Sequence, residues 1–177
     1  ARTSKYDNLL RYEGYELILK ILRYLYQIDA YISIAEVARE RGFVFAEALP
    51  LGGNILEIEG MFHPLIENAI PNSIQADAEH NVVFLTGANM AGKSTFMKTF
   101  GIVVYLAHMG FPLPVKKMRF SVQNGMYTTI NLPDNMMLGY SHFYAEVQRL
   151  KKVAEQVGRI GNLVIVFDEL FRGTNVK

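Results

Sequence analysis

The sequence predicts an α/β fold in which helices flank a mainly parallel β-sheet, preceded by an N-terminal helical segment. From residue 82 onward, short apolar runs alternate with stretches of helical periodicity, which is the order expected of a layered α/β protein. The run Leu163–Phe167 is continuously apolar, which is typical of strands covered on both faces. Before residue 42 there is no proline, and apolar residues recur at helical spacing. We therefore expect a helical segment over residues 1–42 and an α/β domain over residues 43–177.

The first segment has the apolar stripe of a helix over residues 6–41. Gly42 suits the end of this helix, because glycine readily adopts the left-handed conformation, and Arg39 and Arg41 favour the negative end of a helix dipole. A break into two helices at Asp29 stays open. The stripe has spacings of three and four and consists of Leu10, Gly14, Leu17, Ile21, Tyr24, Ile28, Tyr31, Ala35 and Ala38.

The remaining elements follow from the same patterns. Residues 55–59 alternate apolar and acidic side chains, as a half-exposed strand does, and glycines and prolines around them indicate turns. Further strands are expected at residues 82–86, 127–130 and Leu163–Phe167. Helices are expected at residues 93–109 and 141–157.

Composition narrows the class of protein. The 177 residues are 50% hydrophobic with a net charge of +1, so a buried core is expected and intrinsic disorder is not. Zero cysteines exclude a disulfide scaffold, a thiolate metal site and a cysteine nucleophile. No apolar run reaches membrane-spanning length and no secretory signal is visible, so we expect a cytoplasmic protein without a membrane partner. The small basic cluster Lys116, Lys117 and Arg119 is expected on a solvated face.

A phosphate-binding loop is predicted at residues 87–94, here called the P-loop. Its sequence GANMAGKS fits G-x-x-x-x-G-K-[ST], between an expected strand and an expected helix. Its glycines let backbone N–H groups converge on phosphate oxygens, Lys93 reaches the β- and γ-phosphates, and Ser94 ligates Mg²⁺. The alternative is a glycine-rich turn with an accidental lysine. The predicted nucleotide-binding residues are Gly87, Ala88, Asn89, Met90, Ala91, Gly92, Lys93, Ser94 and Thr95.

An acidic pair follows the last apolar run. Asp168 and Glu169 stand where the carboxyl end of a parallel strand places ligand-binding groups. Asp168 is predicted to hold Mg²⁺ together with Ser94. Glu169 is predicted to orient or deprotonate the attacking water, which makes Glu169 and Lys93 the expected catalytic residues. Without a P-loop, such a pair is more often a solvated strand end.

With these motifs placed, the chain resembles the ATPase domain of the MutS family of DNA mismatch repair proteins. The P-loop resembles that family's version, in which an Asn and a Met precede the second glycine. The resemblance extends over nearly the whole chain and includes TGANMAGKSTF (86–96), DELFRGTN (168–175), DNMMLGYSHF (134–143) followed by Glu146, GMFHP (60–64), and the helix end at residues 35–42.

The resemblance implies an ABC-type P-loop ATPase that uses ATP and Mg²⁺. Two such domains face each other in that family, so Ser141 is expected to contact the γ-phosphate bound by a partner, either a second copy or a paralogue. The family's adenine-stacking aromatic position corresponds to Ala69, next to Ile70, which is counted among the nucleotide-binding residues; ATP is therefore assigned mainly by the resemblance. Mismatched or branched DNA is expected to bind through regions outside this chain.

Departures from the family pattern qualify these expectations. His142 and Phe171 replace the family's usual Thr and Gly, and an arginine expected near Thr129 is absent, which suggests a divergent branch. The chain ends shortly after the acidic pair, so it is expected to be a piece of a longer protein and a poor ATPase by itself. The leading hypothesis is a motor domain that couples ATP hydrolysis to DNA-binding parts. The alternative is a nucleotide-gated interaction module with little hydrolysis, whereas the Asn89-Met90 pair disfavours a P-loop kinase or transporter.

Overall fold

The computed structural model describes residues 6–130, 142–168 and 170. The chain divides into two compact units, Ala1–Gly42 and Phe43–Lys177. Within the described residues, no helix has both the length and the apolar character that crossing a membrane would require.

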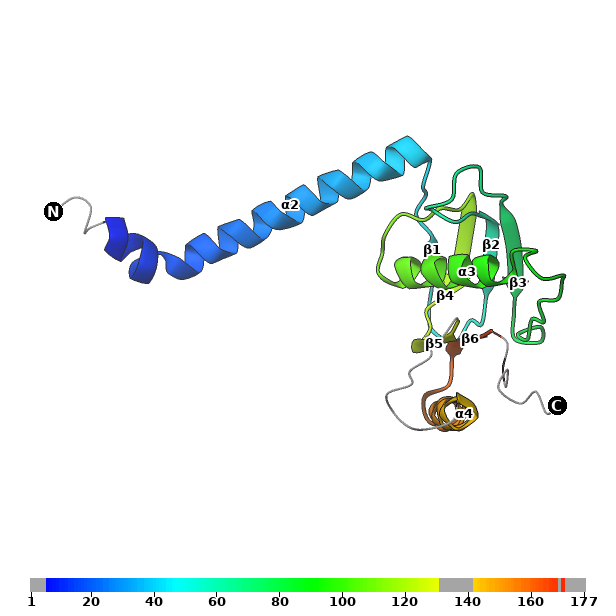
Figure 1. Cartoon of the computed structure of the whole chain (residues 1–177). Helices are drawn as coiled ribbons and strands as arrows, with labels where there is room; N and C mark the ends of the chain where they lie inside the picture. Colours follow the sequence, from blue (N-terminus) through cyan, green and yellow to red (C-terminus); the bar gives the residue numbers. More distant parts are fainter. Residues whose placement is uncertain (1–5, 131–141, 169, 171–177) are drawn as a thin grey trace. The chain divides into compact units, whose positions relative to one another are not determined.

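The N-terminal unit consists of two consecutive helices, which are drawn in blue in Figure 1. A short π-helix, η1 (Leu9–Glu13), precedes the long α-helix α2 (Tyr15–Arg41). The break lies at Gly14, the N-cap of α2, and not at Asp29, which lies inside continuous helix. Gly42 adopts the left-handed conformation (φ 66°) and donates its N–H to the Ala38 carbonyl, which confirms the predicted helix end.

The second unit contains a four-stranded sheet that differs from the expected parallel arrangement (Figure 1). Its strands β1 (Glu47–Leu49), β2 (Leu56–Met61), β3 (Asn72–Ala76) and β4 (Lys117–Ser121) lie in the order β1-β4-β2-β3. Only the β1–β4 pair is parallel, so the prediction of a mainly parallel sheet is wrong here and the sheet is mixed. The physical reason is visible in the alternating polarity of β2 and β4, because antiparallel sheets commonly leave one face solvated.

The polar face of this sheet is formed by cross-strand charge pairs. Arg119 on β4 forms ion pairs with Glu47 on β1 (3.1 Å) and Glu57 on β2 (3.2 Å). Lys116 forms an exposed pair with Glu59 (3.2 Å). The basic cluster, which was predicted to lie on a solvated face, therefore belongs to the polar face of this sheet, where opposite charges lie on neighbouring strands.

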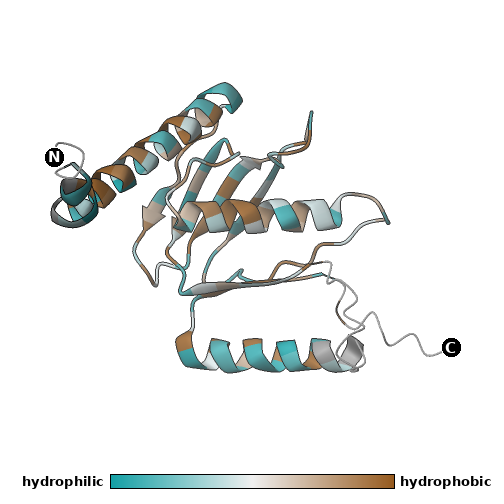
Figure 2. Ribbon diagram, turned by 60° about the vertical axis from the view of Figure 1, so that its left-hand side comes forward, coloured by the Kyte–Doolittle hydropathy of each residue, from teal (hydrophilic) through white to brown (hydrophobic). Residues whose placement is uncertain are grey.

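A second sheet consists of two parallel strands between two helices (Figures 1 and 2). β5 (Gly125–Thr129) pairs with β6 (Leu163–Phe167) in register from Gly125↔Leu163 to Thr129↔Phe167. The helix α3 (Lys93–His108) covers one face and α4 (His142–Ile160) covers the other. The predicted strand Leu163–Phe167 is confirmed, and its continuous apolar sequence is explained by helices on both faces.

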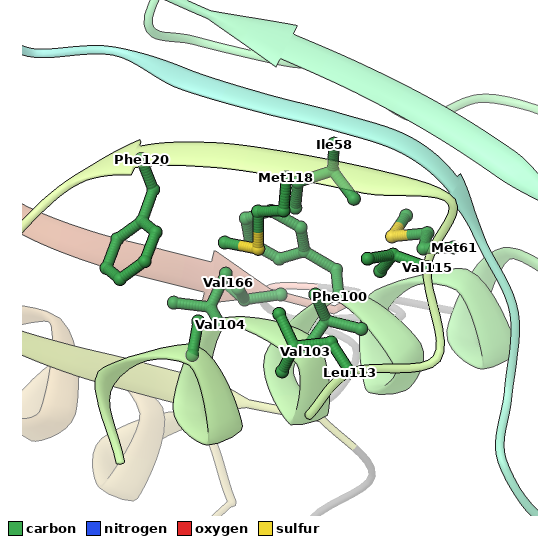
Figure 3. Packing of buried hydrophobic residues seen from close by; sticks show 11 residues of the cluster. Ile58, Met61, Phe100, Val103, Val104, Leu113, Val115, Met118, Phe120 and Val166 are labelled. Carbon is green, nitrogen blue, oxygen red and sulfur yellow. The ribbon is translucent and has the colours of Figure 1, made fainter. Parts of the chain in front are cut away.

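The hydrophobic core lies where α3 packs between the two sheets. Figure 3 shows Phe100, Val103 and Val104 of α3 facing Met118 on β4 and Val166 on β6. Val103 is fully buried, and burying such a side chain contributes about 1.5–3 kcal/mol. The apolar residues in the middle of α3 therefore hold both sheets to the helix that begins at the P-loop.

The expected strand at residues 82–86 does not form. These residues have no strand assignment and pair with no strand among the described residues. Their apolar side chains are largely exposed, up to 88% for Phe84. A β-rich sequence favours a strand only where neighbouring strands and a packed face are available, so propensity alone misleads here.

Candidate nucleotide-binding site

The P-loop runs directly into α3, as the motif predicts, although the strand expected before it is absent. Gly92 is the N-cap of α3 and has φ 92°, a value that side-chain-bearing residues rarely adopt. Met90 also has a positive φ of 63°, and its side chain is fully exposed. Such strained backbone in an exposed loop is typical of functional sites.

Lys93 folds back over the P-loop. Its Nζ donates hydrogen bonds to the carbonyl oxygens of Gly87 (2.7 Å) and Ala88 (2.9 Å). The ammonium group therefore lies at the mouth of its own loop, held by two neutral acceptors. A phosphate oxygen is a stronger acceptor for a cation than a carbonyl oxygen, so Nζ can exchange these partners for an anionic ligand.

The first turn of α3 offers open donors. The first helical hydrogen bond runs from Phe96 N–H to the Gly92 carbonyl (2.8 Å), and no side chain caps the helix. Within the described part of the chain, the N–H groups of Lys93, Ser94 and Thr95 have no acceptor. Open amides together with the positive end of the helix dipole form an arrangement suited to phosphate.

Asp168 extends the β5–β6 ladder by one residue. Its N–H donates to the Thr129 carbonyl (2.9 Å), and its side chain is half-buried. Among the described residues, no hydrogen bond or ion pair occupies its carboxylate. Thr129, which anchors this position, lies inside the strand expected at residues 127–130, but no sequence pattern predicts its hydrogen bond with Asp168.

The P-loop and Asp168 lie at the same end of the second unit. Halfway along α3, Gly101 approaches β5 so closely that an added Cβ would lie 3.9 Å from Thr128 Cγ2. The other end of α3 is tied to the residues before β5, because His108 Nε2 accepts the Gln123 N–H (3.0 Å). α3 therefore runs antiparallel to β5 and β6, and its N-terminus lies toward the strand ends that carry Thr129 and Asp168.

This end can provide ligands for Mg²⁺. Ser94 supplies a hydroxyl from the first turn of α3, and Asp168 supplies a carboxylate that has no partner among the described residues. Mg²⁺ prefers oxygen ligands and usually keeps several waters, so two protein groups suffice beside a bound phosphate. In the described part of the chain, no group of three His, Asp or Glu side chains could form a separate metal site.

One predicted site residue, Ile70, lies apart from this arrangement, and two others cannot be placed in it. Ile70 lies in the loop before β3 and is 82% exposed, and no described contact links it to the P-loop. Ser141 and Glu169 lie outside the described residues, as does most of the segment 134–143. α4 itself begins at His142, close to the predicted start.

An Asx turn lies between β3 and the P-loop. Asp77 Oδ1 accepts the backbone N–H groups of His80 (2.7 Å) and Glu79 (2.8 Å). These two hydrogen bonds, the one from His80 first, lower the pKa of Asp77, because they stabilise the ionised carboxylate. The turn is exposed and redirects the chain toward residues 82–86.

Comparison with known proteins identifies the family. Residues 83–177, more than half of the chain, match the family model of MutS domain V. The chain belongs to the MutS family. Both the P-loop and Asp168 fall inside the span that matches MutS domain V.

Individual MutS proteins resemble the chain over most of its length. The DNA mismatch repair protein MutS of Thermus aquaticus is 31% identical over 163 residues, which cover 90% of this chain and 19% of that protein. MutS of Desulforamulus reducens is 32% identical over 165 residues, with coverages of 89% and 18%. MutS 1 of Halobacterium salinarum is 32% identical over 155 residues, with coverages of 86% and 17%. The chain thus spans less than a fifth of the length of these MutS relatives.

Proposed function

We propose that this chain is the ATP-binding and ATP-hydrolysing part of a MutS-family protein that acts in DNA mismatch repair, with an ABC-type ATPase fold. The observation that carries the proposal is the arrangement at one end of the second unit. There, the open amides of α3 and the ammonium of Lys93 lie toward the same end as the carboxylate of Asp168, which forms no hydrogen bond or ion pair with the described residues. Membership of the MutS family supports the choice of ATP over other phosphate ligands.

In the proposed mechanism, the P-loop binds the triphosphate through backbone N–H groups, and Lys93 leaves the two loop carbonyls to contact the β- and γ-phosphates. Ser94 and Asp168 would hold Mg²⁺, which would neutralise the phosphate charge. Glu169 orients the water for in-line attack on the γ-phosphorus and accepts its proton, while the bond to the β–γ bridging oxygen breaks and ADP leaves. The protein therefore contributes mainly positioning and electrostatic stabilisation.

The same proposal extends to parts outside this chain. A partner ATPase domain, from a second copy or a paralogue, would supply Ser141 to the γ-phosphate. Mismatched or branched DNA would bind elsewhere in the longer protein, and the helices of residues 1–42 would connect the ATPase to it. The relatives described as DNA mismatch repair proteins support this extension.

Titration calorimetry with Mg·ATP tests the binding step. Lys93→Ala removes a charge-assisted contact worth about 1.5–3 kcal/mol, so affinity should fall about 10- to 150-fold. Lys98→Ala is the matched control, because Lys98 is an exposed lysine on the same helix. Equal affinities of wild type and Lys93→Ala would contradict the proposal.

A second function, the nucleotide-gated interaction module, is favoured by His142 and Phe171, which depart from the family pattern. Single-turnover hydrolysis by the longer protein separates the two functions. If Glu169→Gln slows hydrolysis by orders of magnitude, the ATPase is supported. If both proteins hydrolyse equally slowly, the gating module is supported.

A further inference from the structure

Three consecutive backbone N–H groups join three different parts of the second unit. Residues 122–124, here called the junction, connect β4 of the first sheet to β5 of the second. Val122 N–H donates to the Leu49 carbonyl at the end of β1 (3.0 Å). Gln123 N–H donates to the His108 ring on α3 (3.0 Å), and Asn124 N–H donates to the Asn162 carbonyl before β6 (2.8 Å).

His108 is held in one tautomer by this network. Its Nδ1 lies 2.8 Å from the Val104 carbonyl, which can only accept, so Nδ1 carries the hydrogen. Its Nε2 receives the Gln123 N–H and therefore must be unprotonated. The ring also packs against Phe120 on β4, with 4.8 Å between centroids. A neutral histidine with both nitrogens engaged thus joins the C-terminus of α3 to the junction.

Asn124 forms the second half of the connection. Its side-chain Nδ2 donates to the carbonyls of Ile160 (3.0 Å) and Gly161 (3.3 Å) at the end of α4. Gly161 and Asn162 both have positive φ, 61° and 45°, which makes the tight turn into β6. The beginning of β6 is therefore fixed to the same three residues as the end of α3.

The helix α3 and the strand β6, here called the two arms, connect the junction with the candidate nucleotide site. The junction lies at one end of both arms, and the candidate site lies at the other. Fourteen residues of α3 separate His108 from Ser94, about 21 Å at the rise of an α-helix. Six residues separate Asn162 from Asp168, about 20 Å at the rise of a strand. A change of about 5° between the arms would move Ser94 relative to Asp168 by about 2 Å, as much as a whole Mg–O bond length.

Apolar packing alone does not determine how β5 and β6 are placed along α3. Val166 and the other core side chains bury area, but burial is not directional. The hydrogen bonds of the junction are directional, so they select one placement of the arms. Binding of phosphate needs only the P-loop and the start of α3, whereas binding of Mg²⁺ needs groups from both arms.

We propose that His108 and Asn124 are positioning residues that tie α3 and β6 to the junction and thereby set Ser94 and Asp168 at the spacing that Mg²⁺ requires. This inference rests on the proposed function. It predicts that loss of the junction weakens the part of the ATP affinity that depends on Mg²⁺. The part that depends only on the P-loop should not change.

The test is calorimetry of the full chain with ATP, once with MgCl₂ and once with EDTA, and the readout is the ratio of the two dissociation constants. His108→Phe keeps an aromatic ring against Phe120 but removes both hydrogen bonds. We expect it to reduce the Mg²⁺-dependent gain about threefold to tenfold while affinity in EDTA changes by less than about twofold. His108→Gln should restore the ratio, because its amide oxygen can accept the Gln123 N–H.

Gln123→Ala is the matched control. It removes only the side-chain bond to the Ser121 carbonyl (3.0 Å) and keeps the backbone N–H of the junction, so its ratio should equal that of wild type. Long-range ¹H–¹⁵N spectra should also show His108 protonated at Nδ1 and not at Nε2. Should His108→Phe lose cooperative unfolding, Asn124→Ala takes its place in the same measurement.

The possible results separate this inference from the function on which it rests. A wild-type ratio in His108→Phe or in Asn124→Ala, or an equal loss with and without Mg²⁺, would overturn the positioning role while ATP binding stands. Failure of wild type to bind ATP under either condition would overturn the proposed function and this inference with it.

Discussion

Gly92→Ala tests the conformation of the P-loop at its most demanding residue. Gly92 has φ 92°, and nothing lies within 4 Å of an added Cβ, so the substitution changes backbone preference and creates no clash. Holding alanine in a left-handed conformation costs about 1–2 kcal/mol. The lower entropy of the unfolded alanine chain offsets about 0.4–1 kcal/mol of this, which leaves a net destabilisation of about 1 kcal/mol.

The assay is urea unfolding combined with Mg·ATP titration. The free energy of unfolding should fall by up to about 1 kcal/mol, with an unchanged dependence on urea. Any part of this cost that the free protein avoids by relaxing the loop lowers the affinity instead, so the two losses together should amount to about 1 kcal/mol, and affinity should fall by up to about fivefold.

Gly110→Ala is the control at the opposite end of α3, with φ 74° and equally open surroundings. It should lose similar stability and keep its affinity. A Gly92→Ala variant that keeps both the stability and the affinity of wild type would refute the left-handed loop, and an equal loss of affinity in Gly110→Ala would refute the role of Gly92 at the phosphate site.

Other consequences follow from burial and from the Asx turn. Met118→Ala should lower the free energy of unfolding by about 2–5 kcal/mol, because the Met118 side chain is 2% exposed. Met90→Ala is the control, because the Met90 side chain is fully exposed, and it should change this free energy by less than about 0.5 kcal/mol. Urea unfolding of both variants compares the two losses. Ser121→Ala should cost about 1–3 kcal/mol, because the buried Oγ accepts the Ile55 N–H (3.1 Å), and an Ala variant as stable as wild type would contradict this hydrogen bond. Since the pKa of Asp77 is lowered, the ionised carboxylate should stabilise its turn at every pH above the ordinary pKa of an aspartate. This stabilisation should be lost as the pH falls through the lowered pKa. NMR titration of the Asp77 carboxyl carbon should place its midpoint below that of ordinary aspartates.

The parts of the fold that are local in sequence could be predicted from the sequence. The helix end at Gly42, helix α3 and the strand Leu163–Phe167 depend on spacing, caps and continuous hydrophobicity within a short window. The strand β4 was missed, because its pattern KMRFS resembles a basic surface run until β1 and β2 are placed beside it. The prediction for residues 82–86 has the opposite error. Their β-rich composition predicts a strand, but they pair with no strand among the described residues.

For the candidate site, too, the features that are local in sequence could be predicted and those that depend on distant residues could not. The P-loop motif joins its residues within eight positions, so Gly92, Lys93 and Ser94 could be assigned from the pattern alone. The shared end of α3 and β6 depends on contacts between distant residues, such as His108 with Gln123, which no local pattern encodes. The roles predicted for Ser141 and Glu169 stay predictions, because both lie outside the described residues.

The most direct test of the central claim is a ¹H–¹⁵N amide spectrum of the chain with and without Mg·ATP. If backbone amides of the P-loop bind the triphosphate and Asp168 holds its Mg²⁺, the largest shifts should fall on residues 88–95 and on Asp168. Omitting Mg²⁺ should remove the shift at Asp168 and keep part of those in the P-loop. An unchanged spectrum at millimolar Mg·ATP, or shifts confined to the charged face formed by β1, β2 and β4, would contradict the account.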